Sequence, residues 1–117
     1  MANFLFVYRG GDEAFAKMTP DEIQQNMQQW GNWIRQAMQA GWMVDPGDAL
    51  TPEGKVVNAK KVVADGPFVE SKECVGGYSI IKADSLSAAA ELAKGCPGLL
   101  TGGKVEVRPL AGLAAKL

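Results

Sequence analysis

The sequence predicts a single α+β domain in which helices pack against one antiparallel sheet. Apolar residues alternate along residues 3–9, 74–82 and 104–109, as expected for strands. They recur every three or four residues along residues 23–38 and 86–93, as expected for helices. The chain has 117 residues, the length of one ordinary domain. Its apolar fraction of 47% is close to the globular average, so it can build a core without a disulfide or a metal. We expect one domain over residues 1–110 and a short tail over 111–117.

The first predicted element is a strand over residues 3–9, which are rich in aromatic and branched side chains. Its alternate positions are apolar on both faces. Phe4 and Phe6 share one face, whereas Leu5 and Val7 share the other. A strand of this kind is expected at the centre of a sheet, with both faces covered.

A helix is predicted to begin at Thr19. This residue is a good N-cap, Pro20 fits the first helical position, and Glu22 completes a capping box. Gly41 is the expected C-terminal cap. One apolar stripe follows the helical period and is predicted to be buried: Ile23, Met27, Trp30, Ile34 and Met38.

The next segment contains turn signals and short strands. Residues 43–53 hold two prolines and two aspartates around a glycine, so we expect a loop. Residues 54–57 and 61–64 are short strand candidates and predict a hairpin. Asp65-Gly66-Pro67 is predicted to end its second strand through turn chemistry.

Residues 74–82 predict a second strong strand. Gly76 and Gly77 weaken it, so a bulge or the close approach of another group is expected there. Residues 104–109 alternate strictly between charged and apolar side chains, a pattern that is typical of an edge strand.

Between these strands, Asp84 or Ser85 is the expected N-cap of a second helix. The predicted buried side of this helix is mostly small, which favours close packing on the sheet. It consists of Leu86, Ala89, Ala90 and Ala93.

The predicted order is strand, helix, strand or hairpin, strand, helix, strand, which is that of the ferredoxin-like split βαβ arrangement. Right-handed crossovers place both helices on one face of the sheet. The other face is then uncovered although the central strands are apolar on both faces, which is abnormal for a soluble monomer. We therefore expect a homodimer in which two sheets pack face to face.

Composition excludes several function classes. The chain has no histidine, which removes Ser-His-Asp and Cys-His catalysis and the commonest metal ligand. A net charge of −1 argues against a nucleic acid or an anionic membrane as partner. The N-terminus lacks the pattern of a signal peptide, so we expect a cytoplasmic protein.

Cysteine usage and local motifs suggest neither a disulfide framework nor a cofactor. Cys74 and Cys96 are expected to be small buried apolar residues, with a reactive or redox pair as the alternative. The sequence contains no phosphate loop, no dinucleotide fingerprint and no metal-ligand spacing. We therefore expect no cofactor and no metal.

A charged and glycine-rich run follows the predicted hairpin. It consists of Asp65-Gly66-Pro67-Phe68, then Glu70, Lys72 and Glu73, then Gly76-Gly77-Tyr78. This run closely resembles the DGPF subgroup of the YCII-related proteins. Further segments are similar to that family, namely the first strand ending at Tyr8, the helix start Thr19–Glu22, Asp84–Leu86, Cys96-Pro97 and Val105–Pro109.

The resemblance implies a ferredoxin-like fold that forms a dimeric α+β barrel, in agreement with the pattern of elements. It also implies a link of some relatives with extracytoplasmic-function sigma factors. The wider superfamily includes enzymes with a proposed His-Asp catalytic pair. That pair cannot be carried over, because this chain has no histidine.

The run suggests a small-molecule pocket. Asp65 is the candidate catalytic acid or base, since a carboxylate that loses part of its water exchanges protons closer to neutral pH. Lys72 or Arg108 is suited to an anionic substrate group. The predicted ligand-binding residues are Tyr8, Asp65, Gly66, Pro67, Phe68, Lys72, Gly76, Gly77, Tyr78 and Arg108.

Three functions remain open at this point. The first is a homodimeric small-molecule-binding or enzyme-like domain whose pocket lies around the DGPF loop and residues 74–82. The second is an accessory or regulatory protein that contacts a sigma-factor system, an idea carried by family association alone. The third is a purely structural dimer in which Asp65-Gly66-Pro67 only shapes a turn.

Overall fold

The computed structural model describes residues 1–67 and 73–117. Its strands are β1 (Ala2–Arg9), β2 (Met43–Ala49), β3 (Lys55–Val57), β4 (Val63–Asp65), β5 (Val75–Ala83) and β6 (Lys104–Pro109). Its helices are α1 (Asp12–Ala16), α2 (Pro20–Ala40) and α3 (Leu86–Ala93), with 3-10 turns η2 (Pro97–Thr101) and η3 (Leu113–Lys116). The predicted α+β class is confirmed. Among the described residues, no helix is long and apolar enough to cross a membrane.

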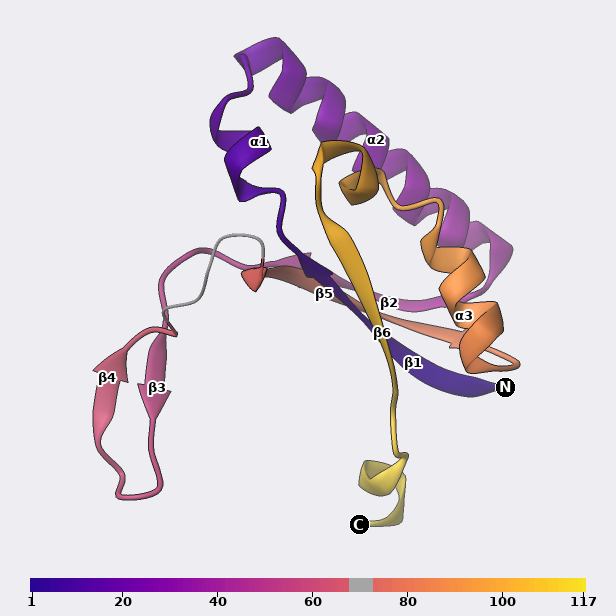
Figure 1. The fold of residues 1–117 in the computed structure, drawn as a ribbon. Helices are drawn as coiled ribbons and strands as arrows, with labels where there is room; N and C mark the ends of the chain where they lie inside the picture. Colours follow the sequence, from indigo (N-terminus) through magenta and orange to yellow (C-terminus); the bar gives the residue numbers. More distant parts are fainter. Residues whose placement is uncertain (68–72) are drawn as a thin grey trace.

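Four strands form one antiparallel sheet in the order β2-β5-β1-β6. This order is consistent with the predicted ferredoxin-like split βαβ arrangement. Helices α2 and α3 both lie on one side of the sheet (Figure 1). Strands β1 and β5 occupy the centre and β6 lies at an edge, as their sequence patterns predict.

The core lies between this sheet face and the helices. Phe4 pairs across the strands with Ile81, and Phe6 and Ile81 are fully buried. Two tryptophans cover Phe6, with ring centroids 6.4 Å away for Trp33 and 6.3 Å away for Trp42. Each large side chain buried in this way contributes about 1.5–3 kcal/mol to folding, so this aromatic cluster fixes α2 against β1.

Helix α2 begins and ends where the sequence predicts. The Glu22 amide donates to Thr19 Oγ1 at 3.2 Å, and the Thr19 amide donates to Glu22 Oε1 at 3.1 Å. Both bonds of the capping box are therefore present. Gly41 ends the helix with φ of 87°, in the left-handed region that glycine adopts without strain.

The buried stripe of α2 differs from the prediction. Met27 and Met38, expected inside, are 68% and 48% exposed. Ile34 of the predicted stripe does pack against the core, where it is joined by Trp33 and Ala37. The small Ala37 side chain lets the second half of α2 approach the sheet, whereas the first half lies beyond the core and borders the pocket described below.

Helix α3 is capped by Ser85, whose side chain accepts a hydrogen bond from the Ala88 amide at 3.0 Å. Ala89 and Ala93 are buried as predicted. Leu86 and Ala90, which were also expected inside, are exposed. The two buried alanines are four residues apart on one face of the helix, and Ala88 and Leu92 pack against the core beside them.

The predicted loop over residues 43–53 is wrong for its first part, which forms the edge strand β2. Met43 pairs with Ile81, and the register shifts on both sides of Asp45. The Gly47 amide donates to Asp45 Oδ1 at 2.8 Å, a turn inside the strand. An edge strand tolerates such irregularity, because only one of its sides must pair.

Strands β3 and β4 form the predicted hairpin, but they make a sheet of their own. Lys55 pairs with Asp65, and Val57 pairs with Val63. The hairpin projects away from the main sheet and the helices (Figure 1). Its expected place as the second strand of the main sheet is therefore wrong, since β2 occupies that position.

Candidate functional site

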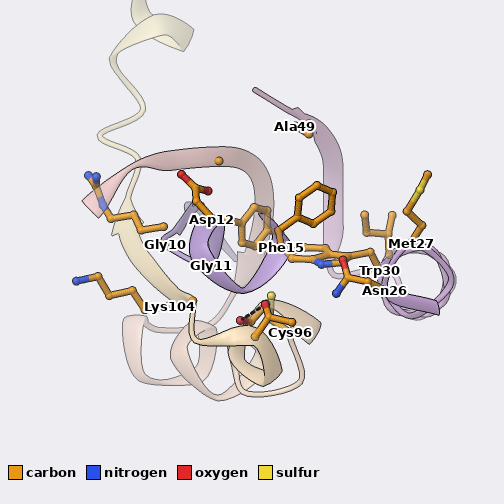
Figure 2. A pocket seen from close by; sticks show the side chains of 18 of the residues that line it. Gly10, Gly11, Asp12, Phe15, Asn26, Met27, Trp30, Ala49, Cys96 and Lys104 are labelled. Carbon is orange, nitrogen blue, oxygen red and sulfur yellow. Dashed lines mark hydrogen bonds between the residues drawn. The ribbon is translucent and has the colours of Figure 1, made fainter. Parts of the chain in front are cut away.

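A pocket of about 530 Å³ lies at the end of the sheet where β1 leads into α1. Its walls come from α1, the first half of α2, the bulged part of β2, the start of β5, and η2 with the residues around it. A volume of this size suits a drug-sized ligand. Figure 2 shows how side chains from these separate segments surround the space.

The inner wall is aromatic. The Tyr8 and Trp30 rings meet edge to face, with centroids 4.9 Å apart, and Trp30 makes a second edge contact with Trp33 at 5.9 Å. At the mouth, Phe15 is 49% exposed and Met27 is 68% exposed. Exposed apolar side chains beside a preformed hollow are typical of a ligand site.

A short hydrogen-bond chain supports this wall from behind. The Tyr8 hydroxyl donates to Ser79 Oγ at 2.8 Å, and Ser79 Oγ donates to the Pro46 carbonyl at 2.7 Å. Ser79 is fully buried, so the chain ties β1, β5 and β2 together beneath the pocket wall. Burial raises the pKa of Tyr8 far above its ordinary value, and the phenol therefore stays protonated at neutral pH.

Charged side chains form one rim of the pocket. Arg9 Nε bonds Glu106 Oε1 at 2.8 Å, and Arg9 Nη1 donates to the Glu73 carbonyl at 2.8 Å. Lys104 Nζ bonds Glu73 Oε1 at 2.7 Å. The hydrogen bond from Arg9 lowers the pKa of Glu106, with a smaller effect from Arg108. Both rim cations are thus engaged by acidic partners.

The two cysteines remain thiols and are not joined. Cys96 lines the pocket and is buried, and burial raises its pKa to about 11. Cys74 is half-buried rather than buried as predicted. Its pKa is raised by lost solvation and by the neighbouring Asp12 carboxylate. Neither thiol has the lowered pKa that is typical of a reactive cysteine.

The paired glycines of β5 serve close strand packing. A Cβ atom on Gly77 would lie 2.8 Å from the Asp48 carbonyl oxygen, a distance that real Cβ atoms do not show. The predicted close approach is therefore present, and the approaching group is the backbone of β2. Gly76 has more room, with the Tyr8 carbonyl oxygen 3.8 Å from an added Cβ, and it lines the pocket.

The structure brings two of the predicted site residues to this pocket, Tyr8 and Gly76. Asp65 lies in the hairpin, where its carboxylate is exposed and pairs with Lys55 at 2.6 Å. Gly66 and Pro67 follow it there.

The other predicted residues lie elsewhere. Tyr78 and Arg108 both lie on the sheet face opposite α2, because they alternate with the buried residues of β5 and β6. Gly77 is buried beneath β2. Phe68 and Lys72 lie outside the described residues.

Several lining residues were missed from the sequence: Asp12, Phe15, Asn26, Met27, Trp30, Asp48 and Cys96. Met27 and Trp30 were predicted as core, because the helical stripe does not reveal where the sheet beneath it ends. Asp48 was placed in a loop. The one sequence signal for a pocket at this end of the sheet was the glycine pair Gly10-Gly11. The pair breaks the chain between β1 and the short helix α1. No group of three or more metal-ligating side chains occurs within residues 1–67 and 73–117.

The fold and the site define a class of protein: an α+β domain with a ferredoxin-like strand order and one preformed pocket at the end of its sheet. A comparison with family models matches residues 3–111 to the YCII-related domain. Because this match covers nearly the whole chain, the protein belongs to the YCII-related domain family. No curated protein matches the chain significantly.

Proposed function

We propose that this chain is a small-molecule-binding or enzyme-like member of the DGPF subgroup, located in the cytoplasm and active as a homodimer. The pocket beside Tyr8 and Trp30 is the ligand site in this proposal. The observation that carries it is the combination of a rigid, hydrogen-bonded rear wall with exposed Phe15 and Met27 at the mouth. A wall that is fixed before binding lowers the entropy lost when a ligand binds.

Binding is tested by thermal shift in a metabolite screen, since a ligand that prefers the folded state raises the melting temperature. Asn26 lies at the pocket, and its side-chain amide bonds no other residue within the part of the chain that the structure describes. The variant Asn26→Ala should lose the ligand-induced shift while it keeps the melting temperature of the free protein. Gln29→Ala removes an exposed amide from the same helix outside the pocket and should behave as wild type.

A homodimer is supported by the amount of surface that one copy leaves open. The chain exposes 8286 Å², whereas a compact monomer of its mass exposes about 6,100 Å². Its radius of gyration is 15.7 Å, against about 13 Å for a compact chain of this length. The difference in area exceeds the roughly 800 Å² per partner of a standard interface, although the projecting hairpin and tail account for part of it.

The proposed dimer surface is the sheet face that α2 and α3 leave uncovered (Figure 1). On this face Leu5 pairs with Ile80, and Val7 pairs with Tyr78. Tyr78 is 38% exposed. Two copies packed through these four side chains would form the barrel-like sandwich that the family resemblance implies.

The dimer is tested by sedimentation at micromolar concentration. Wild type should sediment as a dimer, and Val7→Lys should sediment as a monomer, because a charge at the centre of the interface loses its water. Leu100→Lys is the matched control, since Leu100 is 75% exposed on the helix side of the sheet. A wild-type monomer would remove the dimer from the proposal.

The role proposed for Asp65 depends on this assembly. One copy leaves its carboxylate in solvent beside Lys55, so it acts as an acid or base only where a second copy covers the hairpin. Loss of ligand shifts in Asp65→Asn would support that role. Unchanged shifts in Asp65→Asn, together with lost shifts in Asn26→Ala, would assign the site to the Tyr8 pocket alone.

A further inference from the structure

The inner end of the pocket is built around the Trp30 indole. Besides its edge contacts with Tyr8 and Trp33, this ring lies against the backbone of η2. A Cβ atom added to Gly98 would lie 3.1 Å from Trp30 Cζ2, which is tighter than most real Cβ contacts. Contacts with β1 and η2 therefore hold the indole in place, so it offers a ligand an aromatic surface that is fixed before binding.

The polar groups at this inner end are uncharged and already bonded. The Tyr8 phenol is protonated at neutral pH, and its hydrogen goes to Ser79. The buried Cys96 thiol, with a pKa of about 11, is uncharged as well, and it has backbone hydrogen bonds with Gly98 and Leu99. A charged ligand group placed beside these residues would lose water and meet no opposite charge.

The two cations that border the pocket do not supply a free positive charge. Arg9 bonds the Glu106 carboxylate and the Glu73 carbonyl. Lys104 bonds the Glu73 carboxylate, and Figure 2 shows its side chain extending away from Trp30. An anionic ligand would have to displace these acidic partners before it could use either cation.

The two carboxylates that border the pocket are exposed to solvent. Asp48 pairs across the strands with Tyr78, on the sheet face opposite α2, and its Oδ1 accepts from the Ala49 amide at 2.8 Å. Asp12 lies beside the half-buried Cys74 thiol. Because both carboxylates are hydrated, neither provides a buried counter-charge for a cationic ligand.

The Asn26 side chain adds an uncharged polar group to the pocket. It lies on α2 beside Trp30 (Figure 2), and it makes no hydrogen bond within residues 1–67 and 73–117. A carboxamide can both donate and accept a hydrogen bond but carries no charge. Asn26 therefore suits an uncharged polar substituent of a ligand, such as a hydroxyl or an amide group.

Apolar side chains complete the binding surface. Phe15 is exposed and lies close to Trp30 across the pocket in Figure 2. Met27 follows Asn26 on α2 and is exposed at the mouth. Aromatic rings in stacked or edge-to-face contact gain more than the area they bury, and methionine sulfur also favours aromatic contacts. This surface therefore matches a ligand that contains an aromatic ring.

We propose that the Tyr8 pocket selects uncharged aromatic compounds that carry a hydroxyl or amide substituent. The inference rests on the proposed function, because it assigns a ligand class to the same pocket. In this arrangement the ring packs against Trp30 and Phe15, and the substituent hydrogen-bonds the Asn26 carboxamide. Charged compounds of the same shape are disfavoured, because they lose water beside side chains that offer them no opposite charge.

Three probes of nearly equal size test this selectivity by isothermal titration calorimetry: tryptophol, tryptamine and indole-3-propionate. They share an indole ring with a two-carbon linker, and they end in a hydroxyl, an ammonium and a carboxylate group. Tryptophol should bind at least about tenfold more tightly than either charged probe. Binding of either charged probe within about tenfold of tryptophol would overturn the proposal.

The variant Asn26→Asp places a carboxylate beside Trp30 with almost no change of shape. Its affinity for tryptamine relative to tryptophol should rise by at least about tenfold over wild type, since the ammonium then meets an opposite charge. Gln29→Glu is the matched control, because it adds the same charge at an exposed position of α2 outside the pocket. A ratio that is unchanged in Asn26→Asp, or that rises equally in Gln29→Glu, would contradict the proposal.

Two further outcomes separate the ligand class from the pocket itself. If no probe binds while metabolite shifts are lost in Asn26→Ala, the ligand class is wrong and the pocket stands. If no probe binds and metabolite shifts are absent, or persist in Asn26→Ala, both proposals fail.

Discussion

The Tyr8–Ser79–Pro46 chain predicts a measurable coupling between two side chains that are 71 positions apart in the sequence. In Ser79→Ala, the buried Pro46 carbonyl loses its donor and the Tyr8 hydroxyl loses its acceptor. A buried polar group without a partner costs about 1–3 kcal/mol. Water in the pocket can solvate Tyr8 in part, so we expect a total loss of about 2–3 kcal/mol.

The companion variant Tyr8→Phe removes one donor and leaves the bond from Ser79 to Pro46 in place. Its expected cost is about 1 kcal/mol, the usual net value of one hydrogen bond. The double variant no longer contains a Tyr8 hydroxyl without an acceptor. Its loss of stability should therefore be smaller than the sum of the two single losses by about 1 kcal/mol.

Urea denaturation followed by tryptophan fluorescence measures this cycle, because Trp30 and Trp33 lie beside Tyr8. All variants are compared at one protein concentration, since dimerisation would make stability depend on concentration. The Ser79→Ala loss corresponds to a fall in melting temperature of roughly 8–12 °C for a chain of this length. A stable Ser79→Ala protein, or strictly additive losses, would refute the hydrogen-bond chain.

Three further perturbations follow from single contacts. Thr19→Ala removes the capping-box acceptor of α2 and should destabilise the fold by about 1 kcal/mol in urea titration; an unchanged midpoint would contradict the cap. Gly47→Ala should lower the melting temperature severely or prevent folding, because its Cβ would lie 1.9 Å from the Tyr78 carbonyl oxygen and its φ is +64°. Arg9 lowers the pKa of Glu106 in the folded state, so this contribution to stability is present above pH 4.5 and is lost as the pH falls through the lowered value. The free energy of unfolding of Glu106→Gln should therefore fall less steeply below pH 4.5 than that of wild type. An unchanged pH dependence in this range would argue against the ion pair.

Elements whose signals are local were predictable from the sequence. The capping box at Thr19 and Glu22 is a pattern of four residues, and its two hydrogen bonds form within one turn. Strands β1 and β5 are mostly apolar on both faces, so their central place in the sheet follows from burial. Each of these predictions needs only neighbours in the sequence.

Strand β2 was not predictable in the same way. Its Asp45-Pro46-Gly47-Asp48 segment has turn chemistry, and the turn is present as a bulge, with the Gly47 amide bonded to Asp45. What makes the segment a strand is pairing with β5, which lies far along the chain at residues Val75–Ala83. Pairing with a distant strand outweighs local propensity, and the pattern of a single sequence does not reveal such a partner.

The candidate site was likewise predictable only in part. Tyr8 and Gly76 were predicted from their residue types, and both line the pocket. Asn26 and Trp30 were missed, because a helical stripe predicts a buried face without showing whether sheet or cavity lies beneath it. The charged run that begins at Asp65 attracted attention as a motif, yet Asp65 itself lies in an exposed hairpin, and it is Glu73 near the other end of the run that bonds Arg9 and Lys104 at the pocket rim.

The central claim, that ligands bind beside Tyr8 and Trp30, is tested most directly by a crystal structure of the protein grown with a metabolite that raises its melting temperature. We predict electron density for that metabolite against the Tyr8 and Trp30 rings. Density beside Asp65 in the hairpin, or an empty pocket at a saturating concentration of the metabolite, would contradict the account.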